Sequence, residues 1–184
     1  MEKVILKSLK ACSSVSRSRK NYVLDMSGQW IDRFDGDDEA FDAEVRKWDR
    51  NRNVFLRECT VPAELHLFAF HWNWDNGIKS LRKLIKNPYC DSGTAMMVYW
   101  FSNPHYYCEF RKLTDCPEYN RDALALSRYI EWKFSREGFW SQLVPFDPKP
   151  WLTDEYDQYA VRRIPEIMFQ PIELLNPRQA RKKS

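Results

Sequence analysis

The feature that most constrains the fold is a series of three short apolar runs within residues 60–103. Each run has helical spacing and ends at residues that terminate helices. The first run places apolar side chains at positions i, i+3, i+4 and i+7, namely Leu65, Phe68, Ala69 and Trp72. Thr60 is its predicted N-cap, with Pro62 in the first turn. Gly77 can adopt the left-handed conformation that ends a helix. The run therefore predicts one short amphipathic helix.

The second run starts directly after Gly77 and ends at Asn87-Pro88, because proline and the residue before it both disfavour continued helix. Its two faces differ in polarity: Ile78, Leu81, Leu84 and Ile85 are apolar, and Lys79, Arg82, Lys83 and Lys86 are basic. Such a pattern is typical of a helix with one buried and one solvated face.

The third run, Ala95–Phe101, is apolar on nearly every side and ends before Pro104. A helix without a polar face is usually covered by its neighbours on all sides. Asp91 is its predicted N-cap, because its carboxylate can accept from the free amides of Gly93 and Thr94. We therefore expect this helix to lie at the centre of the fold.

Longer helices are expected over Asp38–Asn51 and Pro117–Glu137, the second ending at Gly138. Val144–Pro150 predicts a rigid linker or turn. A further helix is predicted with Thr153 as its cap, carrying Tyr156, Ala160 and Arg163 and ending before Pro165. Weak strand signals occur at Val4–Leu6 and Glu166–Phe169. The predicted fold class is mainly α: a compact multi-helix domain of short helices joined by tight turns, with minor or no β.

The whole chain, residues 1–184, is expected to form a single helical domain. Within it we distinguish a basic N-terminal segment (1–20), a helical core (60–138) and a proline-rich C-terminal extension (139–184). The basic ends, including Arg178–Lys183, are expected to be solvated tails. The N-terminus lacks an apolar signal-peptide region, no run is long enough to cross a bilayer, and the five cysteines show no CxxC pair. The sequence thus predicts a cytoplasmic protein with reduced thiols and no membrane contact.

Two short motifs lie within this core, NWDNG at residues 73–77 and CDSGTA at residues 90–95. The run from Leu65 to Trp100 that contains them resembles an uncharacterised bacterial family, known as a numbered domain of unknown function, whose members carry NWD[DN]G and CDxGTA. The resemblance implies a small helical module of bacterial origin and implies no activity. The resemblance does not extend to residues 1–60 or to about residues 120–184.

Catalysis by the motif residues is one interpretation. His71, Asp75 and Asp91 could form an acid/base site, with Ser92 or Thr94 nearby. The structural interpretation is favoured, because Asp75 precedes the turn pair Asn76-Gly77 and Asp91 precedes a helix. We therefore expect no catalytic residue in the motifs, and an enzyme with an unfamiliar site remains the alternative.

No metal ion or cofactor is expected. His66 and His71 are five positions apart, so they point to different sides of one helix, and His105-x-x-Cys108 lacks a second ligand pair. With 5 Gly residues the chain holds no glycine-rich nucleotide motif. A formal net charge of +3 is too small to indicate nucleic-acid binding, and the basic face at residues 79–86 is typical of a solvated helix surface.

The acidic stretch at residues 32–48 is the feature most typical of a partner surface, because it combines exposed charge with aromatic rings. The alternative is again a solvated face beside a buried stripe. The predicted contact residues lie in this stretch and near the first motif: Asp35, Asp38, Phe41, Asp42, Trp48, His71, Trp72 and Trp74.

The predicted function is therefore a non-catalytic cytoplasmic domain that binds another protein. Small aromatic-rich bacterial domains without a catalytic signature often serve as immunity proteins that neutralise a cognate toxin, and this analogy names one class of partner. Neither a membrane nor a nucleic acid is expected as a partner.

Overall fold

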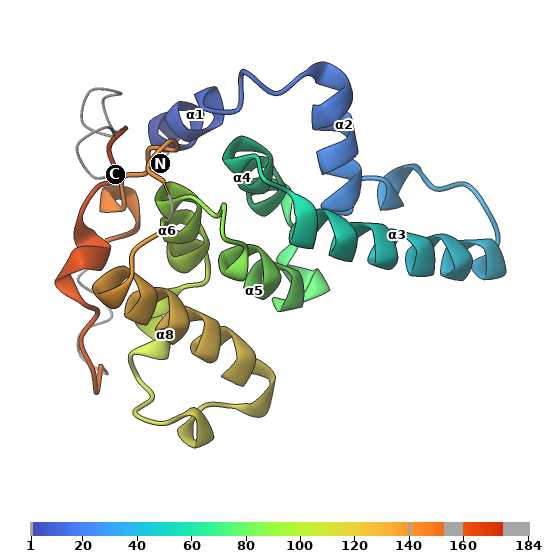
Figure 1. Cartoon of the computed structure of the whole chain (residues 1–184). Coiled ribbons are helices and arrows are strands. Elements are labelled where there is room, and N and C mark those ends of the chain that lie inside the picture. The colour runs from blue at the N-terminus through green and yellow to red at the C-terminus, as the bar shows by residue number, and fades with distance from the viewer. Residues whose placement is uncertain (1, 140, 153–159, 175–184) are drawn as a thin grey trace.

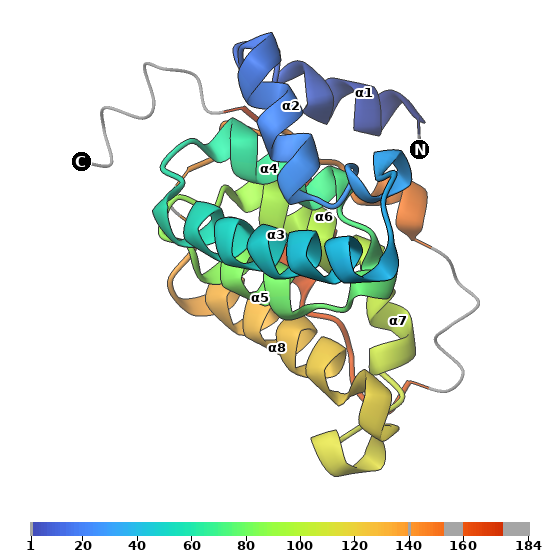
Figure 2. The same cartoon turned by 90° about the vertical axis from the view of Figure 1, so that its right-hand side faces the viewer.

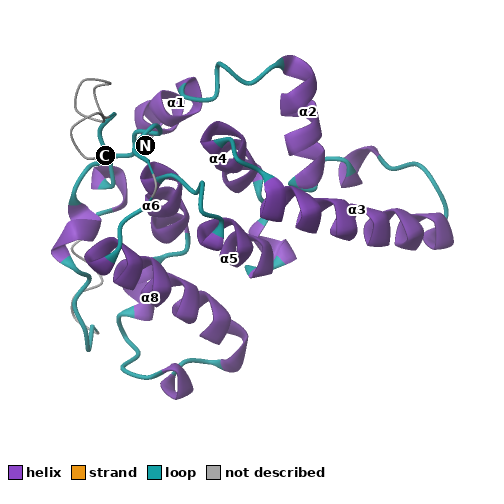
Figure 3. Ribbon diagram, in the orientation of Figure 1, coloured by secondary structure: helices purple, strands orange, loops and turns teal. Residues whose placement is uncertain are grey.

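The computed structural model describes residues 2–139, 141–152 and 160–174. This part of the chain forms eight α-helices and contains no β-sheet (Figure 1, Figure 3). The helices are α1 Glu2–Lys10, α2 Arg17–Met26, α3 Asp38–Glu58, α4 Pro62–His71, α5 Lys79–Lys86, α6 Ser92–Phe101, α7 Pro104–Tyr107 and α8 Arg121–Arg136. Short 3-10 segments lie between them, η1 Ile31–Arg33, η2 Trp74–Asn76, η3 Leu113–Asp115 and η4 Glu118–Asn120, or after α8, η5 Lys149–Trp151 and η7 Glu166–Phe169. The mainly α fold class is confirmed.

Helix α6 occupies the centre of this arrangement, as its uniformly apolar sequence predicts. Every residue from Ser92 to Trp100 is buried, and α4, α7 and α8 pack against the helix. Helix α3 and the C-terminal residues lie on opposite sides of it (Figure 1). In the turned view α3 crosses in front of the inner helices (Figure 2). Helix α1, in contrast, lies on the same side of the core as the C-terminal residues (Figure 1).

The basic N-terminal segment is part of the folded body and not a solvated tail. Val4–Leu6 lies in α1, so the strand signal there was wrong, because a short apolar run does not by itself distinguish a strand from a helix. Helix α2 packs on α4, where the guanidinium of Arg19 donates two hydrogen bonds of 2.8 Å to the carboxylate of Glu64. Cys12 and Val23 are buried beside this contact.

Several predicted helix boundaries were wrong by a turn or more. Helix α3 runs to Glu58 and not to Asn51, because Phe55 and Leu56 beyond the polar stretch are buried in the core. Helix α4 ends at His71, before the motif turn, and α8 starts at Arg121 after a short 3-10 segment.

The caps of the helices agree only in part with the predicted ones. Thr60 does not cap α4: the N-cap is Val61, which makes no side-chain cap hydrogen bond, and Pro62 follows it at the start of the helix. Proline has no amide hydrogen to satisfy there. Gly138 ends α8 as predicted, with a positive φ of 75°.

The proline-rich C-terminal extension packs along the core, and we call its described residues, 141–152 and 160–174, the C-terminal strap. Phe146 and Ile172 form an antiparallel bridge with N–O distances of 3.0 and 2.7 Å. Val144 and Phe146 are buried, so the predicted rigid linker or turn at Val144–Pro150 packs on the core. Glu166–Phe169 forms a 3-10 turn where a strand was expected. Of the helix predicted from Thr153, residues 153–159 lie outside the described residues, and residues 160–164, where it was expected to continue, are not helical. The basic end at 178–183 lies outside the described residues.

None of the described helices has the length and apolar character that a bilayer crossing requires. All five cysteines are buried.

Candidate functional site

The NWDNG motif forms a self-contained turn between α4 and α5. The side chain of Asn73 accepts a hydrogen bond of 2.9 Å from the amide of Asp75, and Gly77 has a φ of 71°. The indole of Trp72 donates to the carbonyl of Gly77 at 2.9 Å, which closes the turn onto the end of α4. Gly77 thus ends the 3-10 segment η2 and not α4 itself. The carboxylate of Asp75 is exposed at the tip.

The CDSGTA motif provides a buried carboxylate with four hydrogen-bond donors. Asp91 is the N-cap of α6, as predicted, and accepts from the amide of Gly93 at 2.8 Å, one of the two amides expected to donate to it. The same carboxylate accepts from the Ser141 hydroxyl and the Leu143 amide, both at 2.6 Å, and from the Val144 amide at 3.2 Å. Burial raises the pKa of Asp91, and these hydrogen bonds oppose the rise. Asp91 therefore joins α6 to the C-terminal strap.

Two neighbours of Asp91 complete this junction. A Cβ atom at Gly93 would lie 1.9 Å from the carbonyl oxygen of Val144, so only glycine lets the strap approach this closely. The hydroxyl of Thr94 lies 3.1 Å from Nδ1 of His66, which is completely buried. Burial lowers the pKa of His66 to about 3, so its ring is neutral. These residues connect α6 to α4 and to the strap.

The three catalytic candidates do not share an open site. Asp91 is completely buried and its carboxylate is fully used by protein donors, so it cannot contact a substrate. Asp75 lies on the exposed turn. His71 ends α4 with its ring edge-on to Phe70 at 5.0 Å, and burial lowers its pKa. The acid/base arrangement of these three residues is therefore not supported.

Two predicted contact residues, Trp48 and Trp72, belong to the core and not to the surface. Their rings stack at a centroid distance of 6.4 Å, and Arg52 lies 4.1 Å above the Trp48 ring. The indole of Trp48 donates to the carbonyls of Asp25 and Met26 at 2.9 and 3.1 Å. Any surface for a partner must be built from the residues around them.

The other contact candidates of the acidic stretch lie at the surface. Asp35, Asp38 and Asp42 are exposed, and Phe41 is half-buried. The Phe41 ring packs against two other half-buried rings, at 5.3 Å from Phe34 and 6.0 Å from Trp30. We call the rings of Trp30, Phe34 and Phe41, with the exposed acids of residues 32–42, the acidic face. The aromatic contacts hold this segment in place although it is rich in charge.

The fold places the acidic face next to the motif turn. A Cβ atom at Gly28 would lie 3.4 Å from the side-chain amide of Asn76 and 3.5 Å from the Trp48 ring. The side chain of Gln29 donates to the carbonyl of His71 at 3.4 Å. Residues 28–29, which lead into the acidic face, thus lie against the motif turn and the end of α4, where His71 and Trp74 are half-buried.

A surface pocket of about 530 Å³ lies against the motif turn. It is lined by Trp74, Asn76, Gly77, Ile78, Lys79, Phe101, Ser102, Tyr107, Tyr119, Asn120, Asp122 and Ala123. Tyr119 is 84% exposed at its rim, the largest exposure among the large hydrophobic side chains of the described residues. The sequence pattern gave no sign of Tyr119 or Asn120, because neither belongs to an apolar stripe.

In the described part of the chain, no group of three or more His, Cys, Asp or Glu side chains is placed to hold a metal ion. His66 and the pair His105 and Cys108 accordingly do not assemble with further ligands there.

Among known proteins, one family matches part of the chain. No curated protein and no solved structure matches the chain. Residues 60–135 match a protein family described as a domain of unknown function, DUF4274. This range runs from the start of α4 almost to the end of α8 and includes both motifs and the whole lining of the 530 Å³ pocket. The central helices thus carry a domain of unknown function, DUF4274, in residues 60–135.

Proposed function

We propose that this protein is a non-catalytic domain that binds another protein through the acidic face and the adjoining motif turn. The observation that supports the proposal is that residues 28–29, which lead into the acidic face, lie against Asn76 and His71. Neither the exposed acids nor the tip of the turn is needed to fill the core. They are therefore free to contact a partner.

The charge of the acidic face defines the chemistry of that partner. Residues 32–42 contain six acidic residues, and their one basic residue, Arg33, is paired with Asp25. A partner with a basic surface would be attracted by this charge and would associate faster at low ionic strength. The acidic face is therefore expected to recognise a basic protein surface.

The aromatic rings of the acidic face supply the apolar part of an interface. Trp30, Phe34 and Phe41 are half-buried, so each still exposes part of a ring among the charges. Their mutual contacts fix their conformations before binding, which reduces the entropy lost on association. Rigid aromatic residues surrounded by charge are typical of the energetically important centre of an interface.

The experiment reverses charge on the face without removing a structural contact. Asp35→Lys/Asp42→Lys changes two exposed acids but keeps Asp37, which caps α3, and Asp38 in its first turn. The matched control, Glu137→Lys/Glu166→Lys, changes two exposed acids at the end of α8 and in the C-terminal strap. Each protein is used as bait, and recovered proteins are quantified at low and high salt.

We expect wild type and control to recover the same basic protein in stoichiometric amount, and the Asp35/Asp42 variant to lose it. Recovery should also fall at high salt because exposed charges are screened. Equal recovery by both variants, or no stoichiometric partner, would contradict the proposal.

The narrower form of the proposal is an immunity protein, by analogy and without a structural signature of its own. Co-expression with the product of a neighbouring gene tests it. Wild type and the Glu137/Glu166 control should restore growth if that product is toxic, whereas the Asp35/Asp42 variant should not. If all three proteins restore growth, immunity does not depend on the acidic face.

A further inference from the structure

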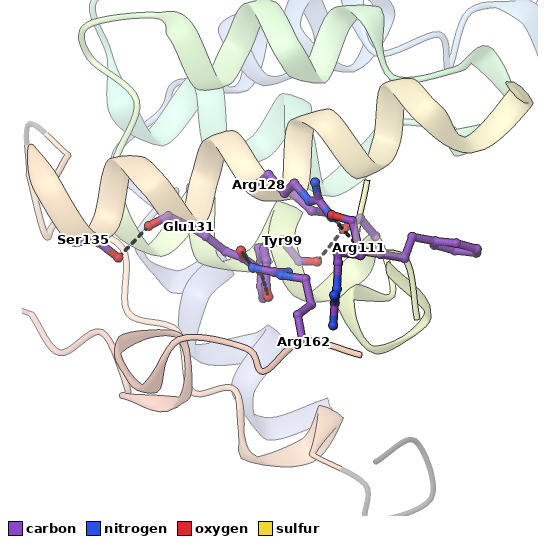
Figure 4. A network of polar contacts seen from close by, with 9 residues as sticks. Tyr99, Arg111, Arg128, Glu131, Ser135 and Arg162 are labelled. Carbon is purple, nitrogen blue, oxygen red and sulfur yellow. Dashed lines mark hydrogen bonds and ion pairs between the residues drawn. The ribbon is translucent and has the colours of Figure 1, made fainter. Parts of the chain in front are cut away.

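A second pocket, of about 470 Å³, lies between α8 and the C-terminal strap. Its lining combines three arginines with a tryptophan and a serine: Arg111, Arg128, Glu131, Trp132, Ser135, Arg162 and Pro165. The arginines come from three parts of the chain, namely the segment after α7, helix α8 and the strap, and their side chains converge (Figure 4). This convergence brings positive charge together that is dispersed in the sequence.

One of the three guanidinium groups is neutralised within the pocket. Arg162 forms a two-pronged ion pair with the buried carboxylate of Glu131, in which Nη1 donates at 3.1 Å and Nη2 donates to the other oxygen. The hydroxyl of Tyr99 donates to the same carboxylate at 2.7 Å. The hydrogen bond with Glu131 also raises the pKa of Arg162. Glu131 therefore has little capacity left to compensate the other arginines.

The charges of Arg128 and Arg111 are not compensated. Nη2 of Arg128 donates to the main-chain carbonyls of Phe110 and Arg111 at 2.7 and 2.9 Å, which orients the guanidinium without neutralising it. Its Nε is buried and has no hydrogen-bond partner among the described residues. Arg111 is exposed. Across the described ranges, no carboxylate lies within 4.0 Å of either guanidinium. The pocket consequently keeps a charge of about +2.

We propose that this pocket binds the phosphate group of a phosphate monoester. Guanidinium groups bind phosphate oxygens through paired hydrogen bonds, and a monoester carries a charge of about −1.5 to −2 at neutral pH. That charge balances two free arginines, whereas a single carboxylate would balance one. Phosphate chemistry therefore fits the pocket better than a carboxylate.

Trp132 indicates what the phosphate is attached to. Its side chain is 47% exposed, and the ring stacks on Tyr129 at 5.8 Å, so its orientation is fixed while part of its surface remains open. A flat ring bonded to the phosphate could pack on this surface while the phosphate contacts Arg111 and Arg128. The expected ligand is thus an aryl or heterocyclic phosphate, either a small molecule or a phosphorylated aromatic side chain of a peptide.

This site is independent of the acidic face, which would repel a phosphate. The two lie on opposite sides of the core, with the acidic end of α3 on the right and the strap on the left of Figure 1. Loss of binding at one site is therefore distinguishable from loss at the other.

Calorimetric titration of the full chain tests the proposal with three probes: inorganic phosphate, phenyl phosphate, and a short phosphotyrosine peptide beside its unphosphorylated form. Arg111→Gln removes one guanidinium that has no structural partner, and Arg46→Gln, on the exposed side of α3, is the matched control. We expect phenyl phosphate to bind wild type and the Arg46 variant equally. Its affinity should fall about tenfold or more in the Arg111 variant, because a charge-assisted hydrogen bond is lost.

Two further measurements separate the ligand classes and the charge state. Trp132→Ala should weaken phenyl phosphate but leave inorganic phosphate unchanged, and the peptide should bind more tightly than phenyl phosphate only if the ligand is a phosphorylated protein. Binding should weaken several-fold from pH 8 to pH 5, because the phosphate loses its second charge near pH 6 while arginine stays charged. Absence of binding by every probe, or equal affinity in the Arg111 and Arg46 variants, would overturn the proposal.

Discussion

The hydroxyl of Ser141 donates a hydrogen bond of 2.6 Å to the carboxylate of Asp91, fifty residues earlier in the chain. This bond crosses the boundary of the family match, because Asp91 lies inside residues 60–135 and Ser141 outside. The helix cap of α6 is thereby also the anchor of the C-terminal strap. An N-cap aspartate usually accepts hydrogen bonds only from the first turn of its own helix, whereas Asp91 also accepts them from the strap.

Asp91→Asn should lower the free energy of unfolding by about 1–3 kcal/mol. The amide nitrogen of asparagine cannot accept the hydrogen bonds that Ser141 and Leu143 donate, so at least one buried donor loses its partner. Urea unfolding followed by circular dichroism measures the change. The control Asp75→Asn alters the exposed carboxylate of the motif turn and should change stability by less than about 0.5 kcal/mol. A loss at Asp75 as large as at Asp91 would contradict these assignments.

Gly93→Ala and Gly77→Ala should destabilise the fold for different reasons. At Gly93 the added methyl group would lie 1.9 Å from the Val144 carbonyl, so the strap must move, at a cost of about 1–3 kcal/mol or more. At Gly77 the surroundings are open, and the cost is that of the backbone conformation alone, with φ 71° and ψ −179°, which is about 1–3 kcal/mol for any other residue. Limited proteolysis should cleave the strap faster only in the Gly93 variant. Equal cleavage of both variants would argue against a close packing of the strap on α6.

Stability should fall as the pH is lowered from about 7 to 5, and His66 should cause much of this fall. Burial lowers the pKa of His66 from 6.5 to about 3, so the unfolded chain binds a proton in this range that the folded chain does not. The free energy of unfolding therefore decreases by about 1.4 kcal/mol per pH unit below 6.5. His66→Gln should reduce the slope of the free energy of unfolding against pH. A smaller pH dependence should remain because the pKa of His71 is also lowered. An unchanged slope in this variant would show that the imidazole does not stay neutral in the fold.

The five cysteines should react slowly with a thiol reagent in the native protein. All are buried, and burial raises the pKa values of Cys12 and Cys59 to about 11, so few thiolates exist at neutral pH. Reaction with a chromogenic disulfide should release five equivalents in denaturant and almost none in the first minutes without it. One rapidly reacting thiol in the native state would place that cysteine at the surface.

Local sequence patterns determined the elements of the central helices. The apolar period of residues 78–85, the uniformly apolar run before Phe101, the cap at Asp91 and the stop at Gly138 all appear where helical spacing and end chemistry predict them. These features depend on residues within one or two turns of one another, so a single chain segment contains the information.

Only the tertiary structure decided which surfaces these elements form. Trp48 and Trp72 occur in amphipathic stretches that could equally face solvent or a partner, and their mutual stacking placed both in the core. The same holds for the pairing of Arg19 with Glu64 and for the convergence of Arg111 and Arg128 beside the strap. Such contacts join residues far apart in the chain, and their partners are set by how the helices pack and not by any local period.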